Sequence, residues 1–158
     1  MNVLVLDLLN YNSQYFYFLD TQKNLLLDGY FTKVIYTHMN FTMNGLYFHF
    51  PIQHSYIENC KDKYYVHFDI NNIQNSSILQ SIFKLETQIL LHYANFTTHR
   101  KNSNMTLYKH LQKGKFRIFE KPPSSLDHFR FILKISGIWE TNEEFGITYK
   151  WLEAKPLI

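Results

Sequence analysis

The stretch ILKISGIWETNEEFGITYKW, residues 132–151, predicts two long strands joined by a short acidic turn. In its second half, polar and apolar side chains alternate with the period of two that a half-buried strand requires. The apolar set consists of Phe145, Ile147, Tyr149 and Trp151. We expect this face to pack against the core, with Thr148 and Lys150 pointing outward.

The same alternation runs through the first half of the segment. By this rule Trp139 shares one face with Phe129, Phe131, Leu133 and Ile135, and Lys134 lies on the other. The pattern therefore predicts that Trp139 and Trp151, the only two tryptophans, both belong to the core. Lys134 and Lys150 are predicted to be available to a ligand.

Further strand-like runs surround a single helical segment. They occur at 3–9, 14–19, 30–39, 45–53, 63–70, 106–120 (broken by a turn near Lys113-Gly114), 128–139 and 145–152. A helix is predicted at about 77–94 from the helical spacing of Ile78, Ile82, Leu85 and Ile89, with a Ser77/Gln80 capping box at its start. This order predicts an α+β, mainly β fold over a single domain, 1–158, either an OB-like antiparallel barrel or a curved sheet with one amphipathic helix.

Composition and motifs argue against several classes of protein. Cys60 is the only cysteine, which excludes an intramolecular disulfide and favours a reducing compartment. The first residues lack the basic region of a signal peptide, and no stretch reaches the roughly 20 apolar residues of a membrane helix. His49, His54 and His67 show no metal-ligand spacing, and no nucleophile motif is present. We therefore predict no catalytic residue, metal or cofactor, and a protein that is not an enzyme.

Positive charge gathers in the second part of the chain. Residues 1–99 contain 5 Lys and Arg against 7 Asp and Glu, whereas residues 100–158 contain 11 against 6. Such asymmetry favours a polyanionic partner. In KGKFRIFEK, alternation predicts one outward row. The row consists of Lys113, Lys115, Arg117, Phe119 and Lys121.

The next strand predicts a second basic face. Arg130 and Lys134 alternate there with apolar residues, and pairing of the two strands would merge both rows into one cationic sheet surface. Arg100 and Lys101 precede these strands. Tyr47 and Tyr65 are predicted on outward faces, where their rings could stack on bases, while Phe48, Phe50 and Phe68 are predicted to be core. A solvated sheet with lysines that protect its edge explains the same pattern without a ligand.

The segment from Lys134 to Glu140 (KISGIWE), together with Gly146 to Lys150 (GITYK), resembles a C-terminal motif of a family of single-stranded DNA-binding proteins of large DNA viruses. The resemblance implies an OB-like domain that coats single strands during viral replication or recombination. It highlights Gly137, Trp139, Glu140, Gly146, Tyr149 and Lys150. An intracellular location follows from the same reading, in the nucleus or cytoplasm of a host cell if the protein is viral.

The sequence thus predicts a non-enzymatic protein that binds single-stranded nucleic acid, with DNA expected and RNA left open. Its binding residues would be the cations and rings named above, and it would bind no membrane. A structural or interaction protein, such as a virion component or an assembly subunit that forms homo-oligomers, is the alternative. A small nuclease is a third hypothesis, without a motif to support it.

Overall fold

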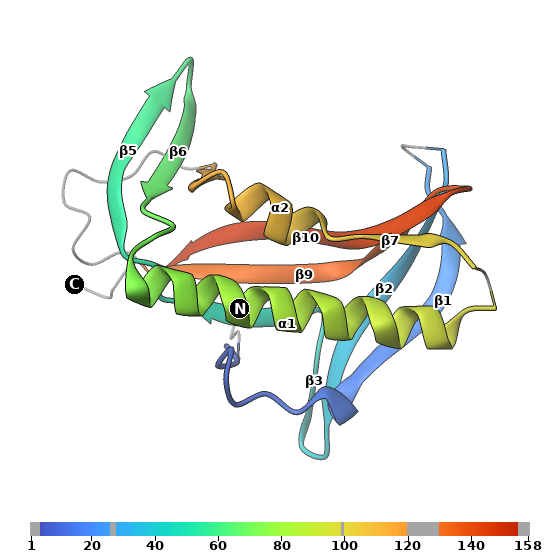
Figure 1. Ribbon diagram of the computed structural model, residues 1–158. Helices are drawn as coiled ribbons and strands as arrows, with labels where there is room; N and C mark the ends of the chain where they lie inside the picture. Colours follow the sequence, from blue (N-terminus) through green and yellow to red (C-terminus); the bar gives the residue numbers. More distant parts are fainter. Residues whose placement is uncertain (1–3, 26–27, 99, 120–129, 155–158) are drawn as a thin grey trace.

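Two β-sheets and one long helix make up the fold in the computed structural model, which describes residues 4–25, 28–98, 100–119 and 130–154 (Figure 1). The elements in chain order are η1 (Ser13–Tyr15), β1 (Phe16–Lys23), β2 (Tyr30–His38), β3 (Phe41–Met43), β4 (Leu46–Phe50), β5 (His54–Cys60), β6 (Lys63–Phe68), α1 (Ile73–Phe96), β7 (Asn102–Asn104), α2 (Thr106–Leu111), β8 (Lys115–Ile118), β9 (Arg130–Glu140) and β10 (Glu144–Ala154). The predicted α+β, mainly β class is confirmed.

The larger sheet is built around β9. It has seven strands in the order β1-β2-β9-β10-β7, with β3 paired to β2 and β4 paired to β9. One edge of β9 is shared, because β4 pairs with residues 131–135 and β2 with residues 137–140. The other edge pairs with β10 along the whole hairpin. The hairpin predicted from residues 132–151 therefore forms the centre of the fold.

The smaller sheet contains three antiparallel strands in the order β5-β6-β8. Its β5–β6 hairpin projects from the end of the molecule where α1 begins (Figure 1). Within the described residues the strands form two open sheets and do not close into a barrel. Of the two predicted architectures, the closed OB-like barrel is therefore not formed by the described residues, whose open sheets fit the curved-sheet alternative.

The helix α1 covers one face of the larger sheet (Figure 1). Its buried side chains include the predicted Ile78, Ile82, Leu85 and Ile89, and they join a core in which Phe48, Leu133 and Ile135 are fully buried. Phe50, Phe68 and Phe131 are also buried, as predicted. Burial of this continuous apolar surface is the main stabilising contribution to the fold.

The helix begins earlier than predicted. Asn72 is the N-cap, and its side chain accepts hydrogen bonds from the backbone N–H groups of Gln74 (2.9 Å) and Asn75 (3.2 Å). Ser77 and Gln80 lie inside the helix, so the predicted capping box is wrong. An asparagine caps a helix as well as serine does, and this one lies a full turn upstream.

Residues 106–111, predicted as strand, form the short helix α2. The N-cap Met105 supplies no side-chain hydrogen bond to this helix. Instead, the fully buried Glu86 of α1 accepts from the N–H groups of Leu107 (3.0 Å) and Tyr108 (2.8 Å). Burial raises the pKa of Glu86, and these N–H groups oppose that effect. The cap comes from a distant part of the chain, which local periodicity does not report.

One predicted strand is absent from the described residues, and one observed strand was not predicted. Within the described part of 3–9, the backbone forms only an isolated bridge between Leu6 and Phe48 in place of a strand. The strand β5 was not predicted, because HSYIENC has too few apolar residues to show an alternating pattern.

None of the helices in the described residues has the length and apolar character needed to cross a bilayer.

A β-bulge in β9 changes which way Trp139 faces. In the β9–β10 pairing, Thr148 is opposite Gly137 and Tyr149 is opposite Ile135, so Ser136 is the extra residue. The bulge reverses the alternation, and Ile138 and Glu140 then face α1. Trp139 is half-buried on the opposite face, so its predicted place beside Phe131 and Leu133 is wrong. Trp151 pairs with Leu133, which precedes the bulge in β9, and it is buried as predicted.

Candidate functional site

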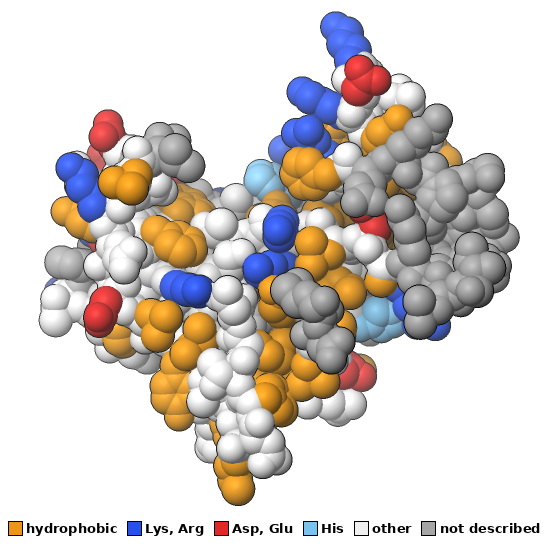
Figure 2. All heavy atoms as spheres, turned by 180° about the vertical axis from the view of Figure 1, so that it is seen from behind, with side chains coloured by type: hydrophobic (Ala, Val, Ile, Leu, Met, Phe, Trp, Pro, Cys, Tyr) orange, Lys and Arg blue, Asp and Glu red, His pale blue; other side chains and the backbone are white. Residues whose placement is uncertain are grey.

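A groove of about 580 Å³ lies between the smaller sheet and the outer edge of β10. Its cationic lining comes from both sides: Lys113, Lys115 and Arg117 from β8 and the turn before it, and Lys150 from β10. Rings of Tyr65, Phe119, Trp139 and Tyr149 also line it. Viewed from the side opposite α1, the surface is hollowed between the smaller and the larger sheet, and Lys and Arg side chains lie around the hollow (Figure 2).

The β8 wall is organised by alternation, as the sequence predicts. Phe116 and Ile118 are buried, whereas Lys115 and Arg117 are exposed. The predicted pairing of β8 with β9 is wrong, because β8 pairs with β6, where Tyr65 is opposite Arg117. The two basic strands therefore belong to different sheets. They meet across the groove and do not merge into one sheet surface.

Each cation of β8 lies over an aromatic ring. Lys115 Nζ is 5.1 Å from the centre of the Tyr65 ring, and the Arg117 guanidinium is 4.8 Å from that of Phe119. The Glu58 carboxylate is 3.9 Å from Lys115 Nζ and 2.7 Å from His67 Nε2, so it offsets part of this charge. Cation–π contacts of this kind hold long side chains in place while leaving their charge available to an anion.

The β10 wall has an open strand edge. Within the described residues, β7 pairs with this edge only at Glu144, Phe145 and Gly146. The strand beyond these residues, from Ile147 to Trp151, lines the groove. Backbone N–H and C=O groups at such an edge can bind a ligand directly.

His110 and Tyr149 form a hydrogen-bonded pair in the groove, with His110 Nδ1 2.5 Å from the Tyr149 hydroxyl. Burial, together with the charge of Glu86, raises the pKa of Tyr149 to about 12, so the hydroxyl keeps its proton. Burial and the nearby Lys113 lower the pKa of His110, which favours the neutral ring. Tyr149 therefore donates to Nδ1, and the proton of His110 resides on Nε2, where it is a donor for an anion or a carbonyl.

Lys134 connects the groove to the face of the larger sheet that α1 leaves uncovered. In the strand pairing, Lys134 is opposite Tyr47 of β4 on one side and opposite Lys150 of β10 on the other. Its Nζ is 5.1 Å from the centre of the Tyr47 ring. Tyr47 is only 6% exposed, so the prediction that its ring faces outward is wrong: the side chain of Lys134 lies over the ring.

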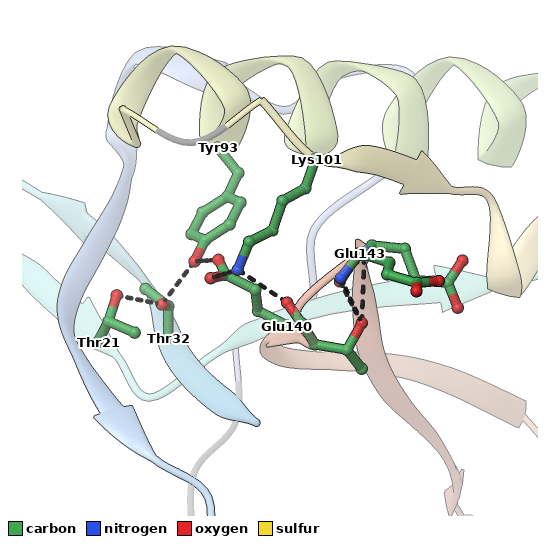
Figure 3. A network of polar contacts seen from close by, with 8 residues as sticks. Thr21, Thr32, Tyr93, Lys101, Glu140 and Glu143 are labelled. Atoms are coloured by element: carbon green, nitrogen blue, oxygen red, sulfur yellow. Dashed lines mark hydrogen bonds and ion pairs between the residues drawn. The ribbon is translucent and has the colours of Figure 1, made fainter. Parts of the chain in front are cut away.

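Lys101 is part of a buried polar network and not of the groove (Figure 3). Its Nζ donates to Glu140 Oε1 and to the carbonyl of Thr141 (2.8 Å). Tyr93 of α1 donates to the other oxygen of Glu140 (2.8 Å) and lies 3.0 Å from the Thr32 hydroxyl. This ion pair ties the segment before β7 to the end of β9. Lys101 is therefore not among the residues that we assign to ligand binding.

The remaining predicted residues are dispersed. Arg100 is exposed in the segment between α1 and β7. Arg130 is exposed at the start of β9 and lines a different hollow of about 540 Å³, together with apolar residues of the N-terminal segment. Lys121 lies outside the described residues. Of the twelve predicted residues, the groove unites Lys113, Lys115, Arg117, Phe119, Lys150 and Tyr65.

The alternation pattern places two groove residues, Trp139 and Tyr149, in the core, and nothing in the sequence points to a third, His110. Trp139 was assigned to the core because alternation alone does not reveal the bulge at Ser136. His110 lies in α2, a segment interpreted as strand. The pairing of His110 with Tyr149 bridges 39 positions in sequence, and no local pattern signals it.

Comparison with protein-family models, with curated proteins and with solved structures finds no match. The chemistry of the groove is therefore the basis for assigning a function. Among the described residues, no group of three or more His, Cys, Asp or Glu side chains converges as a metal site would require.

Proposed function

We propose that this protein binds single-stranded nucleic acid, with DNA as the expected ligand, in the groove between β8 and β10. The observation that carries the proposal is that cations and aromatic rings from two sheets line the same groove. Lysine and arginine contacts to phosphates supply affinity that does not depend on sequence. Rings supply stacking surfaces for any base. The combination is typical of sequence-tolerant binding to single strands.

Lys134, which lies beyond the groove, supports a longer path. It lies beside the groove residue Lys150, on the neighbouring strand of the uncovered face. A single-stranded nucleic acid that leaves the groove across β10 would contact both lysines. The KISGIWE and GITYK segments, which resemble viral single-stranded DNA-binding proteins, contribute Trp139, Tyr149 and Lys150 to the groove. This resemblance extends the proposal to viral DNA replication or recombination.

Fluorescence anisotropy of a labelled oligothymidylate at low salt tests the proposal. A duplex of the same length and a single-stranded RNA serve as comparisons. We expect saturable binding of the single strand and weaker binding of the duplex, because paired bases do not expose their faces to the rings. Absence of binding to either single strand would overturn the proposal. Equal affinity for duplex and single strand would show that the rings take no part.

A second candidate, an assembly subunit, is favoured by apolar side chains on the outer side of α1. Phe83 and Leu91 are 45% and 57% exposed, and the neighbouring Leu9 is 77% exposed. These residues line one shallow hollow between α1 and the N-terminal segment. Size-exclusion chromatography with light scattering at several concentrations tests this candidate. A stable oligomer that dissociates on Leu91→Glu and shows no affinity for oligonucleotide would favour assembly over nucleic-acid binding.

A further inference from the structure

The smaller sheet has one face in the core and one face toward the solvent. The side chains of β6 and β8 on the core face are buried, namely Val66, Phe68, Phe116 and Ile118. Because successive side chains of a strand point to opposite faces, the residues between them lie on the other side of the sheet. We call the part of that side next to the groove the outer face, and it consists of Tyr56, Glu58, Tyr65, His67, Lys115 and Arg117.

Strand pairing arranges the outer face in two rows that cross β5, β6 and β8. The first row is Glu58, Tyr65 and Arg117, and the second is Tyr56, His67 and Lys115. Neighbouring strands are about 4.8 Å apart, so each row spans about 10 Å. Tyr65, Lys115 and Arg117 also line the groove. The two rows therefore begin at the groove and lead away from it to the far strand, β5.

Tyr56 is an accessible ring at the far end of the second row. Its ring is stacked on that of His67, with centres 4.4 Å apart and planes 8° from parallel. The side chain is nevertheless 55% exposed. A base can stack on an exposed ring of this kind whatever its identity. Because His67 already holds the ring, little side-chain freedom is lost when a base binds.

The charges of the outer face favour an anionic ligand. Lys115 and Arg117 are exposed, and Glu58 is the one carboxylate among the residues of the two rows. Glu58 lies 3.9 Å from Lys115 and offsets part of its charge, whereas Arg117 lies over the ring of Phe119. Lys and Arg side chains continue from the hollow along the projecting hairpin (Figure 2). The outer face thus places an accessible ring beside a surplus of positive charge.

We infer that the outer face is a second part of the nucleic-acid site, where a single strand that leaves the groove crosses β8 and β6 and stacks a base on Tyr56. Lys115 and Arg117 hold its phosphates on the way. The inference rests on the proposed function and gives the bound strand a path on the side of the groove away from Lys134. Lys63 lies nearer the tip of the hairpin, outside the groove lining and beyond this path.

Fluorescence anisotropy with a labelled oligothymidylate of about 20 nucleotides tests this path, since one such domain holds roughly 4–16 nucleotides. Tyr56→Ala should weaken binding at least about fivefold, because one stacked base is lost. Tyr56→Phe keeps the ring and should bind as the wild type does. Tyr17→Ala is the matched control, because Tyr17 of β1 is 52% exposed and lies outside the groove lining. It should leave the affinity unchanged.

Tryptophan fluorescence gives a second readout, which reports stacking and not only affinity. In a Trp139→Phe background, the remaining tryptophan, Trp151, is buried. Adding Tyr56→Trp to this background places an accessible indole on the outer face. Oligothymidylate should quench that indole, and the parent Trp139→Phe protein should show no such quenching.

The outcomes separate this inference from the proposed function. Equal affinity of the wild type and Tyr56→Ala, without quenching of the new indole, would overturn the inference and leave the groove as the binding site. Absence of binding by the wild type would overturn both. Polyglutamate that competes as well as unlabelled oligothymidylate of equal charge would assign the surface to acidic peptides and would also overturn the inference.

Discussion

The indole of Trp139 lies against Gly146, so close that a Cβ on Gly146 would be 2.6 Å from the indole Cζ2 atom. Phe31 stands in the same relation to Gly137, where a Cβ would be 2.6 Å from the phenyl Cζ atom. The two glycines of the β9–β10 hairpin thus give space to two rings on the uncovered face of the sheet. Glycine weakens a strand on its own, and a ring that covers it restores packing.

Gly146→Ala should destabilise the fold by about 1–3 kcal/mol, because the new methyl group requires the indole to move. The same substitution should cost less in a Trp139→Leu background, where the clashing ring atoms are absent. Urea denaturation of the two single variants and the double variant measures this difference as a coupling free energy. Equal costs in both backgrounds would show that the indole is not what requires glycine.

Glu86→Leu should also destabilise the fold, by about 1–3 kcal/mol, because it leaves the buried N–H groups of Leu107 and Tyr108 without an acceptor. Glu86→Gln keeps one acceptor oxygen, so we expect a smaller loss. The comparison by thermal and chemical denaturation separates the hydrogen bonds from the volume of the side chain. Wild-type stability in Glu86→Leu would contradict the role of Glu86 as the cap of α2.

Lys101→Met tests the assignment of Lys101 to the buried network. The substitution removes the contact of Lys101 with the Glu140 carboxylate, which is 6% exposed. We expect a loss of about 3–5 kcal/mol in unfolding free energy. The salt dependence of nucleic-acid binding, measured on the folded fraction, should not change. A stable variant with a smaller salt dependence would return Lys101 to the ligand-binding set.

His110 should make stability depend on pH. Because its pKa in the folded protein is below the ordinary value of 6.5, the unfolded chain binds the proton more readily. This contribution to stability is therefore complete above pH 6.5 and is lost as the pH falls below it. His110→Asn should reduce the loss of stability between about pH 7.5 and about pH 5, while the other histidines keep their contributions. An identical pH profile for the variant and the wild type would contradict this prediction.

The sequence identifies the features that depend on neighbours along the chain. Alternation in residues 145–151 correctly places Trp151 in the core, and helical spacing correctly gives the buried side of α1. Alternation also separates Lys115 and Arg117 from Phe116. Each of these predictions uses only the local period of a strand or a helix, which burial of one face imposes.

The errors involve contacts between distant parts of the chain. The bulge at Ser136 depends on how β9 fits two strands on one edge and β10 on the other. The helical state of residues 106–111 depends on Glu86, and the position of β8 depends on its pairing with β6. The sequence therefore predicts only part of the candidate site. Its cations follow from alternation, whereas tertiary structure places Trp139 and His110 in the groove.

The salt dependence of oligonucleotide binding tests the central claim most directly. For the wild type, the logarithm of the affinity should fall linearly with the logarithm of salt concentration. In a Lys113→Ala, Lys115→Ala, Arg117→Ala variant the slope should decrease by about 0.7 for each lost phosphate contact, or about 2 in total. Lys23, Lys63 and Lys84, which are exposed outside the groove lining, give the matched control when all three are changed to alanine. A slope reduced only in the groove variant is the predicted result, and equal slopes in the wild type and the groove variant would contradict the account.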